Sequence, residues 1–194
     1  MVLMKKFALA LASTLLVLSA AGAMAAVPSK TTTDVTRVKA VESTEPTLVV
    51  KVAEDAAPVA EEIAKIYQQV AGNGQAAVAY FPTETQSEII ALLPEGVKSS
   101  AMIMNEFVTL TAEGVAADGK ATFTFTTRYT VNQKVVVVIG LYDGTRGANG
   151  QYNVEWVVLD AEALENGDIA VEFPAELVER MENAVATAMA VLND

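Results

Sequence analysis

The chain has 194 residues, of which 13 are basic and 24 acidic, and it contains no histidine and no cysteine. The absence of both residue types excludes Ser-His-Asp and Cys-His catalysis, thiol redox chemistry, disulfides and zinc sites of the usual ligand types. The formal net charge of −11 opposes binding to nucleic acid and to anionic membrane surfaces.

Residues 1–25 have the features of a secretory signal peptide. The basic pair Lys5-Lys6 precedes an apolar run over 7–18, and a small-x-small pattern, Ala-Met-Ala, ends at Ala25. We therefore predict cleavage before Ala26. The expected product is a secreted, extracellular protein with no membrane association once the leader is removed.

Residues 26–46 are rich in Thr, Ser, Lys and Glu and show no strong periodicity, so they predict a flexible leader. Val35, Val38 and Val41 leave open the alternative of an edge strand in this segment. Cleavage before Ala26 would remove two of the 13 basic residues and none of the 24 acidic ones, so the remaining 169 residues would carry a net charge of −13.

Residues 47–96 predict a small strand–helix–strand–helix unit. Thr47–Val52 has the composition of a strand, and an amphipathic helix follows, with Asp55 as its cap and Pro58 in its first turn. Its apolar stripe has helical spacing and consists of Val59, Ile63, Ile66, Tyr67 and Val70.

The second half of this unit is predicted as a strand over Ala76–Phe81 and a helix over Thr83–Leu93. The sequence Thr-Glu-Thr-Gln at Thr83–Gln86 fits a capping box at the start of that helix. A unit of this size cannot bury its own apolar faces, so we expect it to pack on or beside the remaining β-rich region.

Residues 97–194 predict an antiparallel β-sandwich of immunoglobulin-like type. Val135–Ile139 is a run of five β-branched residues, which is typical of a central strand covered on both faces. The short connection at Asn132-Gln133 predicts that Ala121–Tyr129 is an antiparallel neighbour of Val135–Ile139. The Gly-rich connection over Asp143–Gly150 predicts the same for Val135–Ile139 and Tyr152–Leu159. The predicted strands are Met102–Thr111, Ala121–Tyr129, Val135–Ile139, Tyr152–Leu159 and Ile169–Phe173.

The C-terminal tail has two interpretations. Its Ala and Met content favours one continuous helix. The alternation of Val185, Thr187, Met189 and Val191 with alanines instead favours a strand. We predict a short helical turn over 175–182 and a strand over 186–192, because the central strand needs neighbours on both edges.

A succession of ten segments runs through the mature sequence: LVVKVAED, AEEIAKIYQQV, VAYFP, EIIALLPEG, MNEFVTLT, ATFTFTTRY, QKVVVVIGLYD, VEWVVLDAEAL, IAVEFPAELVERM and AMAVLND. In this succession the chain resembles small secreted proteins of anaerobic Gram-positive gut bacteria, and the resemblance covers the whole mature chain. It implies a helical turn leading into a closing strand at the C-terminus. It implies no activity and no functional residues.

Three features have both a functional and a structural interpretation. Asp143 and Asn149 could hold Ca²⁺, although a plain Gly-rich turn explains this segment better. Trp156, with Tyr142 and Tyr152, could form an aromatic surface for a sugar or peptide, although its shared face with Val154 and Val158 favours a buried core position. An acidic contact surface, or simply solvated helix faces, could be formed by Glu61, Glu62, Glu176, Glu179 and Glu182.

The sequence therefore predicts no catalytic, cofactor-binding or metal-binding residue, and no cofactor. We expect a secreted, non-catalytic binding or structural module of α+β class, whose partner is an extracellular protein or glycan. One alternative is a small hydrolase that uses a pair of carboxylates. Another is an inhibitor or chaperone of a secreted partner.

Overall fold

The structure is a computed structural model that describes residues 38–43, 48–52, 59, 61–62, 65–66, 69–70, 77–114 and 118–194. The predicted signal peptide, the cap at Asp55 and the first-turn Pro58 lie outside these residues. In the part of the chain that the structure describes, no helix is long and apolar enough to cross a membrane.

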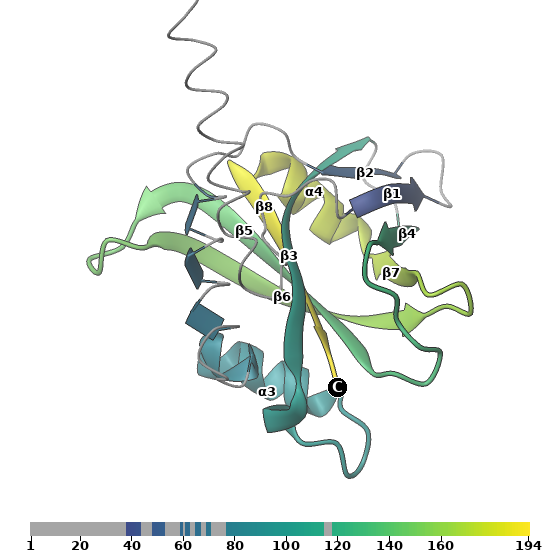
Figure 1. Ribbon diagram of the computed structural model, residues 1–194. Coiled ribbons are helices and arrows are strands. Elements are labelled where there is room, and N and C mark those ends of the chain that lie inside the picture. The colour runs from purple at the N-terminus through teal and green to yellow at the C-terminus, as the bar shows by residue number, and fades with distance from the viewer. Residues whose placement is uncertain are drawn as a thin grey trace, which may run out of the picture.

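The eight strands in the described residues belong to one antiparallel sheet with the order β1-β4-β7-β6-β5-β8-β3-β2. The outermost strands, β1 and β2, contact each other, so the sheet curls until its two edges meet (Figure 1). This closure covers strand edges that would otherwise be open to pairing with another chain. The strands are β1 (Val38–Ser43), β2 (Leu48–Val52), β3 (Ile103–Gly114), β4 (Gly119–Phe125), β5 (Val135–Arg146), β6 (Tyr152–Ala163), β7 (Ile169–Phe173) and β8 (Ala186–Asn193).

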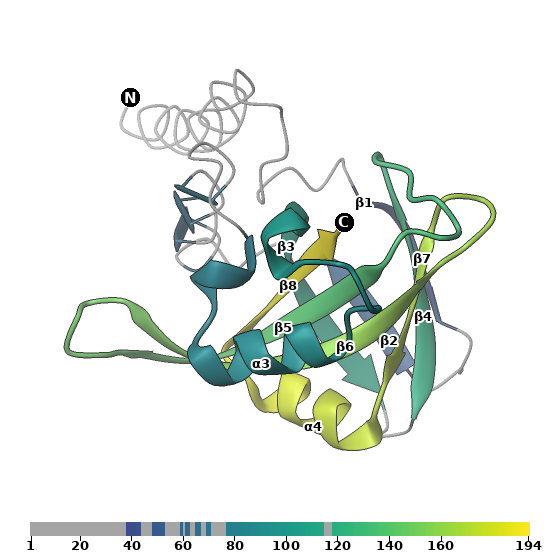
Figure 2. The ribbon, with the colours of Figure 1, turned by 90° about the horizontal axis from the view of Figure 1, so that it is seen from below.

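The helices pack on opposite faces of this sheet. The helix α4 (Ala175–Asn183) contributes to the core inside the curl, while α3 (Thr83–Ala91) and the 3-10 helix η3 (Ala77–Tyr80) contribute to the core on the outer face. Figure 2 shows α4 below β5 and β6. A second 3-10 turn, η4 (Ser99–Ala101), leads into β3.

The strand β5 separates the two cores. Its residues alternate between them, with Val135, Val137 and Ile139 in the inner core and Val136 and Val138 in the outer core. All five side chains are fully buried. The prediction of a central strand covered on both faces is therefore confirmed, and β6 and β8 supply its two neighbours.

The predicted β-rich α+β class is confirmed, but the immunoglobulin-like sandwich is not what the described strands form. A sandwich has two sheets packed face to face, whereas these strands form one hydrogen-bonded sheet around its own inner core. The helix α4 takes the place of a second sheet, because its buried face carries Leu177, Val178 and Met181 into that inner core.

The strand–helix–strand–helix unit is also not seen as a separate unit. The strand β2 pairs with β3 in the main sheet, and residues 77–80 form a 3-10 helix where we predicted a strand. Val78 and Phe81 lie three residues apart, so a 3-10 turn buries both in the outer core. Val59, Ile66 and Val70 are helical and reach the same core, as their spacing predicted.

Two predictions at element ends are corrected. The prediction of a capping box at Thr83–Gln86 is wrong, because Pro82 occupies the N-cap position without a side-chain cap. The side-chain amide of Gln86 instead donates a hydrogen bond to the Phe81 carbonyl at 2.6 Å. Part of the predicted flexible leader forms β1, which confirms the alternative of an edge strand. Val38 and Val41 from this strand pack against the inner core.

The tail is a helix followed by a strand, as we predicted. The chain leaves α4 at Ala184, whose φ of −73° and ψ of 145° are extended, and then enters β8 between β5 and β3. Met189 and Val191 face the inner core, whereas Ala188 and Ala190 face the outer one. Small side chains on the outer face allow the covering segments to approach closely.

Candidate functional site

The two candidate sites lie at the free end of the β5–β6 hairpin. Its turn is closed by a hydrogen bond from the Gly147 amide to the Gln151 carbonyl at 2.9 Å. Gly144 and Gly150 both have a φ of 79°, a conformation that glycine adopts at little cost. The register of the hairpin shifts between Tyr142 and Arg146, and pairing resumes where Arg146 meets Tyr152.

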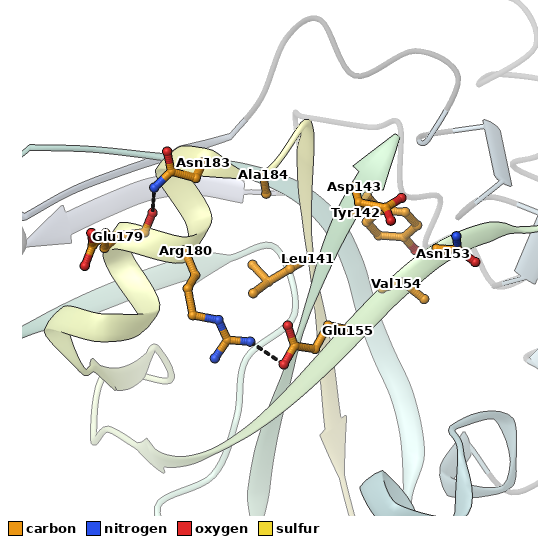
Figure 3. Close-up of a pocket in the computed structure, with 10 residues that line it drawn as sticks. All are labelled: Leu141, Tyr142, Asp143, Asn153, Val154, Glu155, Glu179, Arg180, Asn183 and Ala184. Atoms are coloured by element: carbon orange, nitrogen blue, oxygen red, sulfur yellow. Dashed lines mark hydrogen bonds and ion pairs between the residues drawn. The ribbon is translucent and has the colours of Figure 1, made fainter. Parts of the chain in front are cut away.

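The first candidate is a cleft of about 610 Å³ between this hairpin and the C-terminal half of α4, which we call the α4 cleft. Figure 3 shows the side chains around it. The strands contribute Leu141, Tyr142, Asp143, Asn153, Val154 and Glu155, and the helix and the residue after it contribute Glu179, Arg180, Asn183 and Ala184.

One ion pair spans the α4 cleft. The guanidinium of Arg180 lies 2.7 Å from the carboxylate of Glu155, so a helix residue is joined to a strand residue across the opening (Figure 3). The Glu155 side chain is 69% exposed, so water screens the pair and its contribution to stability is small. The Glu155 carboxylate therefore remains within reach of a ligand, whereas the Arg180 side chain is 33% exposed and its paired Nη2 atom is buried.

The carboxylate of Asp143 is held by its own turn. It accepts hydrogen bonds from the amide and the hydroxyl of Thr145, both at 2.7 Å. These bonds favour the ionised form and lower the pKa of Asp143. Asp143 therefore faces the cleft as a fixed negative charge, and it is a poor proton donor.

The calcium interpretation gains no support from this arrangement. Asp143 accepts its hydrogen bonds from Thr145, while the side-chain oxygen of Asn149 accepts one from the Gln151 amide at 3.1 Å. The side-chain oxygens of Asp143 and Asn149 thus accept hydrogen bonds in separate turns and do not point to one shared ion. Among the described residues, no group of three or more His, Cys, Asp or Glu side chains is arranged to hold a metal ion.

The second candidate is a pocket of about 330 Å³ on the outer face of the hairpin, which we call the aromatic pocket. It shares only Tyr142 and Val154 with the lining of the α4 cleft. Its full lining is Glu62, Tyr80, Phe81, Pro82, Tyr142, Gln151, Tyr152, Val154 and Trp156.

Trp156 is partly buried at the edge of the outer core, so it is neither a fully buried core residue nor a free surface ring. Its ring centroid lies 5.1 Å from that of Phe81 and 6.3 Å from those of Tyr80 and Tyr142. These neighbours meet it at 77–84°, so the rings form walls rather than a flat stack.

Glu62 brings a negative charge to the aromatic pocket. Its carboxylate accepts a hydrogen bond from the Tyr152 amide at 3.2 Å and pairs with the Arg146 guanidinium at 3.4 Å. Burial and, to a lesser extent, the charge of Glu62 raise the pKa of Tyr80 to about 12. Burial, with Tyr80 and Glu62 as smaller causes, also raises the pKa of Tyr142.

The structure brings some of the sequence candidates together and separates others. Tyr142, Tyr152 and Trp156 meet in one pocket, as the aromatic interpretation required. The acidic candidates do not form one surface. Glu62 lines the aromatic pocket and Glu179 the α4 cleft, whereas the remaining three are exposed and line neither, namely Glu61, Glu176 and Glu182.

Sequence reasoning missed Glu155 and Arg180 of the α4 cleft, whereas it named Glu62 of the aromatic pocket only as a possible acidic contact. The alternation of β6 places Glu155 on the other face of the strand from Trp156. Arg180 lies on α4 three residues after the buried Leu177. No local pattern, however, pairs Arg180 with Glu155 or brings Glu62 to Tyr152. Those contacts join residues far apart in the chain.

Comparison with known proteins does not identify either site. The resemblance to small secreted proteins of gut bacteria stays a prediction. No protein-family model, no curated protein and no solved structure matches this chain.

Proposed function

We propose that this protein is a secreted, non-catalytic binding module that binds an extracellular protein or glycan in the α4 cleft. The observation that carries the proposal is the cleft itself, an opening of about 610 Å³ with polar and charged side chains from the hairpin and from α4. Secretion rests on the predicted signal peptide and cleavage before Ala26.

The chemistry of the cleft suits a polar ligand. Arg180, Asn153 and Asn183 carry hydrogen-bond donors, while Glu155 and Asp143 carry acceptors. Leu141 and Ala184 add apolar surface between them. Hydroxyl groups of a glycan, or the side chains and amides of a protein loop, could satisfy both sets of groups.

The carboxylates of the cleft are better placed for binding than for acid–base catalysis. Glu155 forms an ion pair with Arg180, and Asp143 has a lowered pKa. A carboxylate-based glycosidase needs one carboxyl group that stays protonated, which usually requires an apolar environment that raises its pKa. The hydrogen bonds from Thr145 act on Asp143 in the opposite direction.

Binding is tested with the secreted chain against cell-wall material, glycans and culture-supernatant proteins, using Arg180→Gln as the site variant. Loss of one charged hydrogen-bonding group should weaken ligand binding by about tenfold or more. Lys120→Gln is a matched control, because Lys120 forms an ion pair of similar exposure with Glu162 outside the cleft. Equal effects of the two variants would contradict binding in the α4 cleft.

A hydrolase remains a second candidate because three carboxylates, Asp143, Glu155 and Glu179, line one cleft. Release of reducing sugars from polysaccharides by the wild-type chain, abolished by both Glu155→Gln and Asp143→Asn, would favour it. Ligand binding without turnover, reduced by Arg180→Gln, would favour the binding module.

A further inference from the structure

We propose that the aromatic pocket binds an organic cation, an ammonium or guanidinium group, between the Glu62 carboxylate and the surrounding rings. The site is independent of the α4 cleft, because the two pockets lie on opposite faces of the β5–β6 hairpin and share only Tyr142 and Val154. The proposal thus goes beyond the binding function proposed above.

The first support is the shape of the pocket. Trp156 meets Tyr80 at 84° and Tyr142 at 77°, and Tyr152 meets Tyr142 at 78°. Four rings set nearly at right angles to their neighbours form a concave enclosure of about 330 Å³. Aromatic faces carry partial negative charge, so such an enclosure attracts a cation more than a neutral group of equal size.

The second support is the position of Glu62. Its side chain is only 19% exposed, yet it lines the pocket, so its charge acts across a partly desolvated space. Its field is felt by the phenols on both sides, since it contributes to the raised pKa of Tyr80 and of Tyr142. Tyrosine is neutral at ordinary pH, so Glu62 is the charged group among the described residues that line the pocket.

The third support is the Arg146 guanidinium, a cation of this chain that contacts both the Glu62 carboxylate and the Tyr152 ring. The Arg146 guanidinium lies 3.4 Å from one Glu62 oxygen and 3.8 Å from the centre of the Tyr152 ring. Its side chain is 51% exposed and it is not part of the pocket lining. A carboxylate oxygen can accept more than one hydrogen bond, so Glu62 retains capacity for a second cation from inside the pocket.

The pocket should therefore hold a free quaternary ammonium compound or the end of a basic side chain. Choline and Nα-acetyl-arginine amide are probes for these two sources. The neutral compound 3,3-dimethylbutan-1-ol has the shape of choline without its charge. Binding can be followed by the fluorescence of Trp156, the single Trp of the chain, which lies in the pocket wall.

We expect saturable binding of at least one of the two cations in the millimolar range or tighter, and at least about fivefold weaker binding of the neutral compound. If only choline binds, the ligand is a small ammonium compound, and if only the arginine derivative binds, the ligand is a basic side chain. Equal affinity for choline and its neutral counterpart, or no binding of either cation, would overturn the proposal.

Glu62→Gln should weaken cation binding at least about fivefold. Gln can still accept the hydrogen bond from the Tyr152 amide, so the pocket keeps its shape. Glu84→Gln is the control, because Glu84 is exposed on α3 outside the pocket lining. Should Glu62→Gln fail to fold, Arg146→Gln removes the positive charge that lies 3.4 Å from Glu62, so it should raise the affinity for a cation about twofold or more. An unchanged affinity in that variant would refute the role of Glu62.

Discussion

Gly140 and Trp156 show how one side chain depends on the absence of another. They are register partners on β5 and β6, and a Cβ atom built on Gly140 would lie 2.5 Å from Cζ3 of the Trp156 ring. The ring therefore lies directly over the glycine backbone. Gly140 fixes the position of Trp156, and with it one wall of the aromatic pocket.

We expect Gly140→Ala to lower the free energy of unfolding by about 1–3 kcal/mol, because the added methyl group displaces a packed ring. Urea denaturation measures this change, and the Trp156 fluorescence should shift with it. Trp156→Phe shortens the ring and relieves the clash, so the double variant should lose less stability than the sum of the single variants. Additive losses would show that the two residues do not compete for space.

Tyr80 gives the protein a defined sensitivity to alkaline pH. The pKa of Tyr80 is raised to about 12 in the folded protein, whereas the pKa of a tyrosine in the unfolded chain is about 10. Between these values the unfolded chain releases a proton that the folded chain keeps, so the free energy of unfolding falls as pH rises from about 10 to 12. The contribution is fully present below pH 10.

Urea denaturation across this pH range should show the loss of stability, and Tyr80→Phe should make the decline shallower. Tyr142→Phe should do the same, since burial raises the pKa of Tyr142 as well. A wild-type stability that is constant from about pH 10 to 12 would contradict the raised values.

At the level of elements, α4 decides the architecture. This helix has nine residues, and its buried face fills the inside of the curled sheet while its exposed face forms one side of the α4 cleft. The helix thus couples the inner core to the proposed binding site. Damage to its buried face should cost far more stability than damage to its exposed face.

Leu177→Ala should lower the free energy of unfolding by about 2–5 kcal/mol, because it removes a buried side chain and leaves a cavity in the inner core. Glu182→Ala on the exposed side of the same helix should change it by no more than about 0.5 kcal/mol. Thermal or urea denaturation of both variants checks the difference. Similar costs would mean that α4 does not fill the curl.

At the scale of the whole molecule, the chain is acidic, and its net charge depends on whether the predicted signal peptide is removed. The formal net charge of −11 becomes −13 if residues 1–25, with two basic and no acidic residues, are removed. We expect N-terminal sequencing of the secreted protein to begin at Ala26. Secreted protein that retains Lys5-Lys6 would contradict this cleavage site.

We also expect EDTA to leave the melting temperature of the protein unchanged within a few degrees. The described residues offer no cluster of three metal-ligating side chains, and the oxygens of Asp143 are held by Thr145. A structural metal would contribute to stability, so its removal would lower the melting temperature. A clear fall in EDTA would reveal a site that these contacts do not show.

The local pattern of residues identified most of the strands and the faces that they bury, although the strand predicted over Ala76–Phe81 is a 3-10 helix at residues 77–80. Alternation placed Phe123 and Phe125 in the core, and the continuous apolar run of β5 indicated cover on both faces. The tail was divided correctly into helix and strand because alternating Val, Thr and Met residues outweighed the helical preference of its alanines. These patterns act over a few residues, so the sequence alone carries them.

Only the tertiary structure decided which strands are neighbours and where the pockets lie. Short connections suggested that β4 would pair with β5, yet β4 pairs with β1 and β7, and β8 from the C-terminus lies beside β5. Every strand offers the same backbone donors and acceptors, so pairing is chosen by the fit of whole faces around α4. The same long-range packing brings Arg180 to Glu155 and Glu62 to Tyr152, which no short stretch of sequence encodes.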